Sequence, residues 1–361
     1  MKSGKCADME YRPCFLSYAN NKATRSMVQY RVSRNTFKDN QRTLLLPLSF
    51  GISSSILLHM LNGQIEHQLA GHAGRAGYNL HVLIVEPSTI SPSSPSCQAR
   101  LDFIRQCYPR HKYTMVAFHS IFQYDSDITN SIQQFGGPGY VDDETKSDSE
   151  RLDNFRASIL TATSKDDIDN LLLIRLVVAF AKQHGCEGVL WGDSDSRLAA
   201  KTLANVAKGR GASLTWQVCD GPSPWGLQFC FPLRELYRSE LQLYANQIPE
   251  LEKTIIIPGQ PASEISNRNL SIDELMNQYI LTQGEKYPGV MANIVRTVNK
   301  LQPASNSASK TRCEFCAAPV RLATDLTAGG ANINALGEDP HAQLCHGCAR
   351  SGADFVGSGN R

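Results

Sequence analysis

Short apolar runs alternate along this sequence with longer stretches in which apolar residues recur every three or four positions. The apolar runs predict strands at 43–50, 80–85, 113–118, 188–191 and 227–231. The helical spacing predicts helices that include 56–69, 97–107, 171–185, 197–208, 272–286 and 290–301. Strands that alternate with helices are typical of a parallel sheet with helices on its faces, so we predict an α/β fold.

Changes in composition divide the chain into segments. Residues 133–153 carry GGPG and then DDETKSDSE, a polar and acidic stretch without the apolar residues needed to bury surface, so we expect a mobile insertion there. The sequence PASNSASK at 303–310 is typical of a linker. The predicted division is an N-terminal cysteine-containing segment at 1–40, an α/β domain at 41–302, the linker, a metal-binding module at 311–350 and a frayed tail at 351–361.

Composition and charge narrow the class of protein. The chain has 361 residues, 42% of them hydrophobic, and its 36 basic and 34 acidic side chains give a net charge of +2. A net charge this close to zero does not indicate a nucleic acid or any other charged partner. A surface that binds nucleic acid would therefore have to be a local patch of basic residues. No apolar run reaches the about eighteen residues of a membrane span, and residues 1–20 resemble neither a secretory signal nor a transit peptide. We therefore expect a soluble, cytoplasmic protein without a membrane partner.

Four of the eleven cysteines form two C-x-x-C pairs, Cys313 with Cys316 and Cys345 with Cys348. Each pair can present two thiolates from one turn, and two pairs supply the four sulfur ligands that a structural zinc ion prefers. In a reducing compartment this pattern favours metal ligation over disulfides. We predict a structural zinc site, with an iron–sulfur cluster or four free thiols as the alternatives.

A glycine- and serine-rich turn, SFGISSS at 49–55, joins the first predicted strand to the first predicted helix. Such a turn can bind phosphate, because the free amides and the dipole of the helix both point at the anion. Many turns of this kind carry glycine and serine for helix capping alone. From the residues themselves both interpretations remain open.

The turn resembles the S-G-G-x-D-S loop of the PP-loop ATP pyrophosphatases. The later segment GDSDSRLAAKT, with Gly192, Asp193 and Asp195 as its candidate loop residues, resembles the G-H-N-x-D-D-x-A-E-T motif of the members that thiolate tRNA. The segment FPLRELYRSEL at 231–241 and the cysteine pairs extend the resemblance over almost the whole chain. The sequence is therefore similar to the cytoplasmic tRNA 2-thiolation protein 2 family, the non-catalytic partner subunits of the wobble-uridine thiolase.

This resemblance implies a PP-loop ATPase-like domain, of the adenine nucleotide alpha hydrolase-like type, with a C-terminal zinc module of four cysteines. The loop departs from the pattern in two places. Phe50 replaces the first glycine, where a bulky side chain would obstruct a pyrophosphate, and Ser53 replaces an aspartate of the ATP site. Ser49, Gly51 and Ser54 match. We expect a degenerate nucleotide loop and little ATP binding by this chain.

The other cysteines give no catalytic assignment. No cysteine lies between Ser120 and Lys182, where the active thiolase subunit has a C-x-x-C. Cys6 and Cys14 are spaced too irregularly for one metal knuckle. The remaining single cysteines lie in or beside apolar elements and are expected to be core residues: Cys97, Cys107, Cys186, Cys219 and Cys230. We name no catalytic residue.

Basic residues form two candidate patches, one of Lys22, Arg25, Arg31 and Arg34 and one of Arg197, Lys201, Lys208 and Arg210. Arg197, Lys201 and Lys208 are spaced to share one face of a predicted helix. Such a stripe is either a solvated face or a surface for the phosphates of tRNA. The resemblance favours tRNA.

By the same resemblance, the chain is the partner of a catalytic thiolase subunit in a heteromer. That complex would place sulfur on the wobble uridine of the tRNAs for lysine, glutamate and glutamine, with a thiocarboxylated ubiquitin-related modifier as the sulfur donor. This chain would bind tRNA and support the catalytic subunit, as a pseudoenzyme. Two alternatives remain: the chain itself adenylates tRNA with ATP, or it is a zinc-bearing adaptor without RNA contact.

Overall fold

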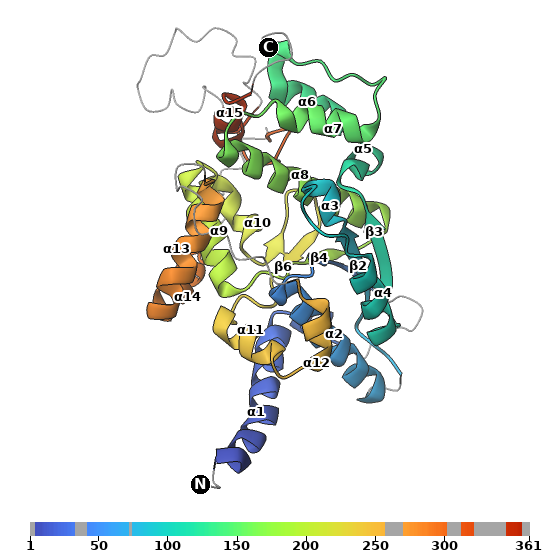
Figure 1. Ribbon diagram of the computed structural model, residues 1–361, viewed down its shortest axis with the longest axis vertical. Helices are drawn as coiled ribbons and strands as arrows, with labels where there is room; N and C mark the ends of the chain where they lie inside the picture. Colours follow the sequence, from blue (N-terminus) through green and yellow to red (C-terminus); the bar gives the residue numbers. More distant parts are fainter. Residues whose placement is uncertain are drawn as a thin grey trace.

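The computed structural model describes residues 4–32, 42–71, 74–256, 270–301, 312–320 and 344–355. Within these ranges a six-stranded sheet has the order β3-β2-β1-β4-β6-β5 (Figure 1). Neighbouring strands are parallel except for β5 and β6, which are antiparallel. The strands are β1 (Arg42–Pro47), β2 (Tyr78–Val85), β3 (Lys112–Val116), β4 (Gly188–Leu190), β5 (Gly221–Pro222) and β6 (Gln228–Cys230).

Both faces of the sheet are buried because apolar side chains point in both directions from its central strand. In β1, Leu44 and Leu46 belong to one core and Leu45 to the other, as the alternation of side chains along a strand requires. The first core is covered by α1 (Gly4–Arg25), η1 (Val28–Tyr30), α2 (Ile52–Gly71), α4 (Gln98–Cys107), α11 (Arg238–Ala245) and α12 (Pro249–Thr254).

The second core lies under helices that follow β3 in the sequence. It includes Phe180, Leu198 and Trp216. Its helices are the later part of α8 (Ala162–Gln183), α9 (Asp195–Ala207), η4 (Gly211–Ser213), α10 (Leu214–Gln217), α13 (Ile272–Lys286) and α14 (Pro288–Val298). The predicted bounds of the helix at 272–286 agree with α13. These observations confirm the predicted α/β fold.

A third apolar cluster joins the cysteine pairs to the α/β domain. Phe135 and Phe155 pack against Phe315, which lies inside the first cysteine pair, with ring centroids 4.9 and 6.5 Å away. In Figure 1 the short C-terminal helix lies beside the helices at the top of the view. The elements around this cluster are α3 (Pro87–Ile90), η2 (Phe118–Ser120), α5 (Ile121–Tyr124), α6 (Ile128–Gly136), η3 (Gly137–Gly139), α7 (Asp148–Ala157) and α15 (His346–Gly352).

Segment 133–153 contains buried apolar residues and the start of a helix, whereas the sequence suggests a polar insertion. Tyr140 and Leu152 are buried in the third cluster. Ser147 caps α7 in a capping box with Glu150, so the acidic stretch begins a helix. The linker at 303–310 lies outside the described ranges, as do residues 321–343 and 356–361. The positions of the domain boundaries stay a prediction.

None of the described helices is both long enough and apolar enough to cross a bilayer.

Candidate functional site

The four cysteines of the two C-x-x-C pairs converge on one point. Their sulfur atoms all lie within 4.8 Å of one another, and all four side chains are buried. Cys316 Sγ and Cys345 Sγ are 3.3 Å apart. Both pairs therefore contribute to a single centre, as the sequence predicts.

Each pair is presented by a tight local structure. In the first, the Cys313 N–H donates to Ala318 O at 2.8 Å and the Ala317 N–H donates to Cys313 O at 2.7 Å. Ala317 has φ of 57°, a left-handed conformation that reverses the chain between these bonds. In the second, Cys345 is the residue before α15 and Cys348 lies in its first turn. Both turns aim two thiols in one direction.

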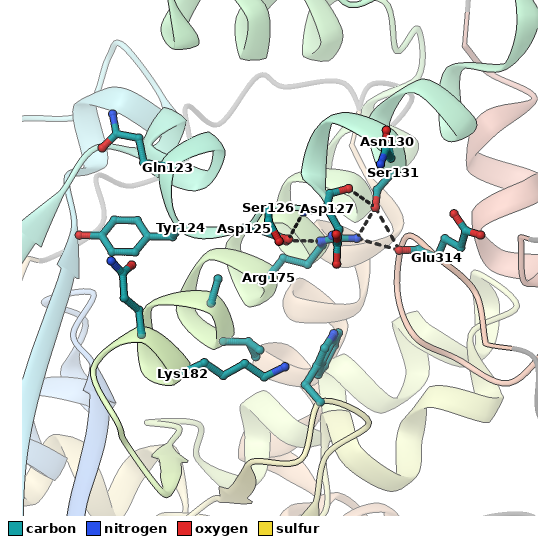
Figure 2. A pocket seen from close by; sticks show the side chains of 14 residues that line it. Gln123, Tyr124, Asp125, Ser126, Asp127, Asn130, Ser131, Arg175, Lys182 and Glu314 are labelled. Carbon is teal, nitrogen blue, oxygen red and sulfur yellow. Dashed lines mark hydrogen bonds and ion pairs between the residues drawn. The ribbon is translucent and has the colours of Figure 1, made fainter.

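A buried arginine of α8 holds the first turn in place. Arg175 Nη1 donates to the carbonyl oxygens of Glu314 and Phe315 at 2.8 and 3.0 Å, and Nε donates to Asp125 at 2.7 Å. Figure 2 shows this arginine at the side of a cavity of about 800 Å³, between Asp125 and the backbone of Glu314. Because the guanidinium binds main-chain atoms, it fixes the course of the cysteine turn.

A second arginine lies directly against the sulfur atoms. Arg210 Nη1 donates to Cys348 Sγ at 3.4 Å, and its Nε donates to Asp167 Oδ1 at 2.8 Å. Ser351 of α15 also donates to Asp167, at 2.8 Å. Burial alone would raise the pKa of Asp167, but the charges and hydrogen bonds of Arg210 and Lys208 hold it below its usual value. A buried ionic network thus connects the cysteine centre to α8.

The cysteine centre fits one tetrahedral metal ion. Zinc–sulfur bonds of about 2.3 Å in a tetrahedron place the sulfur atoms about 3.8 Å apart, which agrees with the crowding of the four thiols. Four thiolates around a divalent ion leave a net negative charge, and Arg210 supplies a positive charge beside it. The geometry and the donor set therefore suit a metal, as the sequence predicts.

The structure corrects the basic patch around α9. Lys208 and Arg210 are each 2% exposed. Lys208 Nζ lies 2.7 Å from Asp273 and 3.0 Å from Asp167. Both residues serve the ionic network of the core, so they cannot form a surface for tRNA. Helical spacing failed here because residues distant in sequence cover that side of the helix.

Fewer basic residues are exposed and unpaired than the two predicted patches contain. The side chain of Arg197 is 54% exposed. Lys201 Nζ lies 2.5 Å from Asp193 Oδ2, so its charge is largely compensated. In the N-terminal patch, Lys22 pairs with Glu240 at 3.2 Å. Arg25 and Arg31 are exposed, while Arg34 lies outside the described ranges.

The Phe50 side chain does not obstruct the predicted nucleotide loop in the way that the sequence suggests, because it points into the core. Phe50 has φ of 56°, the left-handed conformation that favours glycine, yet its side chain is fully buried in the first core. Its carbonyl oxygen accepts a hydrogen bond from the Ile256 N–H at 2.8 Å. The phenyl ring therefore fills the core beneath the turn. The backbone at position 50 thus has the conformation that favours glycine, although the residue there is phenylalanine.

The two loops identified in the sequence touch each other. A Cβ atom on Gly192 would lie only 2.8 Å from the Cα of Ser54, so a side chain at position 192 would collide with the start of α2. Ser54 Oγ donates to Gly51 O at 3.2 Å and lies 3.1 Å from Ser49 Oγ. Ser49 and Ser54 thus bond within the turn, whereas Ser55 Oγ is buried without a partner among the described residues. Parallel strands end at the same edge, which brings both loops together.

Comparison with known proteins gives a consistent relationship. The profile of the cytoplasmic tRNA 2-thiolation protein 2 family matches residues 271–335. A protein of that name from Aspergillus clavatus is 53% identical over 341 residues, which cover 94% of this chain and 90% of the relative. Another from Ajellomyces capsulatus is 48% identical and covers 94% of this chain and 95% of the relative. This chain belongs to the cytoplasmic tRNA 2-thiolation protein 2 family.

A solved structure extends the relationship to the fold. The U34-tRNA thiolase NcsA from Methanococcus maripaludis, determined with its 4Fe-4S cluster, superposes with a TM-score of 0.53 over 90% of this chain and 91% of that one, at 15% identity. The likeness confirms the predicted PP-loop type of α/β fold for this member of the family.

The buried cysteines outside the cysteine centre of this family member are poor nucleophiles. Burial is the main cause that raises the pKa of Cys97 to about 12 and those of Cys186 and Cys230 to about 11. Cys219 is also buried, Cys107 is half-buried and Cys14 is exposed. The side chain of Cys6 lies outside the described part. A thiol with a raised pKa carries little thiolate at neutral pH.

Asp195, a candidate residue of the second loop, is a buried carboxyl group. Its side chain is 2% exposed, and Oδ2 has no hydrogen-bond partner among the described residues. Oδ1 accepts from Ser196 Oγ at 2.8 Å. Burial raises the pKa of Asp195 to about 6. The sequence shows an acidic residue here but cannot show that it is buried.

Asp195→Asn is expected to change how stability depends on pH. The pKa of Asp195 is higher in the folded protein than in the unfolded chain. As pH rises from about 4 to about 6, the carboxyl group therefore ionises more readily in the unfolded chain, which destabilises the fold. This destabilisation persists above about pH 6. The variant should therefore be more stable than the parent at pH 7, by about 1–2 kcal/mol after loss of a helix-dipole contact. Urea unfolding at pH 4 and pH 7 measures the difference. Equal differences at both pH values would contradict it.

Proposed function

We propose that this chain is a non-catalytic subunit of a cytoplasmic tRNA thiolase complex that carries out 2-thiolation of the wobble uridine in tRNAs for lysine, glutamate and glutamine. The observation that carries the proposal is the identity of 53% with a named cytoplasmic tRNA 2-thiolation protein 2 over 94% of the chain. In this complex a second subunit provides catalysis, and a thiocarboxylated ubiquitin-related modifier provides the sulfur.

The remodelled loop supports a non-catalytic role. An ATP site in a loop of this shape needs open backbone amides and a carboxylate near the phosphates. Here Ser53 stands in place of the carboxylate. The Lys201 ammonium, which could otherwise meet a phosphate, binds Asp193 at 2.5 Å. The missing carboxylate and the pairing of Lys201 with Asp193 support a loop that serves as a turn in this chain.

We further propose that the cysteine centre holds zinc in a structural role. Each iron of a four-iron cluster takes one cysteine, which spreads the four sulfur atoms more widely than a single ion does. Sulfur atoms that all lie within 4.8 Å of one another therefore support a mononuclear ion. Zinc bound there would cross-link the turn at Cys313 to α15. Arg175 would hold the turn at Cys313 in position, and Arg210 would do the same for the turn at Cys345.

Reconstitution tests the proposed division of labour. We expect the catalytic subunit with this chain to thiolate tRNA, measured by mass spectrometry of nucleosides, and each subunit alone to be inactive. Calorimetry should detect no binding of ATP to the isolated chain. Micromolar binding of ATP by this chain would instead assign adenylation to it.

The same reconstituted complex separates a tRNA-binding subunit from an adaptor without RNA contact. Arg197→Glu should weaken binding of tRNA several-fold at low salt, because a surface cation would become an anion beside phosphates. Arg296→Glu, on the exposed side of α14, is the matched control. Unchanged tRNA affinity in Arg197→Glu would remove this residue from the RNA surface.

A further inference from the structure

A second cavity lies at the edge of the sheet opposite to the two loops. It has a volume of about 320 Å³ and opens where β1, β2 and β3 begin. Thr43, Asn79 and Lys112 line it from these three strands. His184, directly after α8, completes it from the side of the second core. The nucleotide-type loops follow the other ends of the strands, so this cavity is separate from them.

The lining of this cavity is basic. It contains Arg110, Lys112 and three histidines, and no carboxylate among the described residues. Arg110 and Lys112 are exposed and form no ion pair with a carboxylate in the described ranges. Glu187, whose N–H donates to Thr43 O at the rim, has its carboxylate 3.5 Å from Arg42. Within the described part of the chain, no carboxylate pairs with Arg110 or Lys112, so both cations are available to an anion.

The histidines of the cavity are held rigidly. His81 Nε2 lies 2.9 Å from Thr114 Oγ1, and His111 Nε2 lies 3.0 Å from Asn62 Oδ1. The ring of His184 stacks on Phe180 with a centroid distance of 4.0 Å. Fixed side chains lose little entropy when a ligand binds, so these three rings form a preorganised wall of the cavity.

Burial first, and then the neighbouring positive charges, disfavour the protonated form of His81 and His111. Burial, and then the charge of Lys112, lowers the pKa of His81 to about 4. Burial and the charge of Arg110 lower the pKa of His111 to about 4, against a smaller opposing effect of Glu66. Additional protons are unfavourable here, whereas an anion would be attracted to Arg110 and Lys112.

We propose that this cavity binds a phosphate group. Arginine and lysine are the side chains that proteins use most for phosphate, and the Asn79 amide and the Thr43 hydroxyl add neutral donors. A cavity of about 320 Å³ admits a phosphate with an attached sugar and excludes a folded segment of a protein. The phosphate is either a phosphodiester of RNA or a free phosphorylated small molecule. The site does not depend on the proposed thiolase function.

The test uses the full chain with labelled histidines and inorganic phosphate as the probe. We expect phosphate, at constant ionic strength against chloride, to shift the ring signals of His81 and His111 in a saturable way. Arg110→Ala combined with Lys112→Ala should weaken this binding at least tenfold. Arg105→Ala, an exposed arginine paired with Asp102 on α4, should leave it unchanged. Absence of saturation, or equal affinity in the double variant, overturns the proposal.

A second arm of the test identifies the source of the phosphate. If the double variant also weakens binding of tRNA by the complex with the catalytic subunit, and phosphate competes with tRNA, the group is an RNA phosphodiester. If tRNA binding is unchanged while phosphate binding is lost, the ligand is a free phosphorylated molecule. Both results support the phosphate site. A complex that fails to thiolate tRNA would overturn the proposed function and leave the phosphate measurement valid.

Discussion

Cys348→Ser is expected to lose the bound metal and a large part of the stability of the protein. The Cys348 side chain is fully buried between Arg210 and the other three cysteines, so water cannot take the place of the lost ligand. Loss of the ion frees the turn at Cys313 and α15, which together cover Phe135 and Phe155 in the third cluster. Structural zinc sites contribute folding free energy directly, so the loss should be on the order of 5 kcal/mol.

Two measurements on purified Cys348→Ser check this expectation. Elemental analysis should find about one zinc ion per parent chain and almost none in the variant, and denaturant unfolding should give the change in stability. Cys14→Ser is the matched control, since Cys14 is exposed and lies outside the centre. A variant that keeps its metal and its stability would show that Cys348 is not a ligand.

Asp167→Asn is expected to destabilise the protein by about 3–5 kcal/mol, because it leaves the buried Arg210 guanidinium without its carboxylate, although Lys208 keeps Asp273. Asp167 is 1% exposed and accepts from Arg210 and Ser351, with Lys208 3.0 Å away. Its carboxylate also orients Arg210 toward the Cys348 sulfur. Metal affinity should therefore fall by about 10- to 100-fold, as for other residues behind metal ligands.

Urea unfolding and competition with a zinc chelator measure the two effects of Asp167→Asn. Asp153→Asn is the control, because that carboxylate is 67% exposed and its contact with Arg156 is long, at 3.8 Å. Surface pairs of this kind contribute about 0–1 kcal/mol. A loss below about 1 kcal/mol in Asp167→Asn would mean that Lys208 and Arg210 find other partners.

The strands, the main helices and the two cysteine pairs could be predicted from the sequence because each leaves a local pattern. Leu44 to Leu46 form an apolar run, and the helix at 272–286 carries a capping serine at Ser271. The spacing of Cys313 and Cys316 is itself the signature of a ligand pair. The N-terminal helix α1 carries no comparable signal, since its apolar residues do not gather on one face and Pro13 lies within it.

The roles of Lys208, Arg210 and Phe50 were decided only by the tertiary structure. Along the sequence, Lys208 and Arg210 continue a basic stripe, and nothing near them shows that Asp167 will lie against both. Phe50 occupies a loop position that suits glycine, and only the packed core shows where its ring goes. Local patterns determine elements and ligand pairs because those depend on neighbours in the chain. Burial and charge pairing depend on residues brought together by folding, so the sequence alone could not assign them.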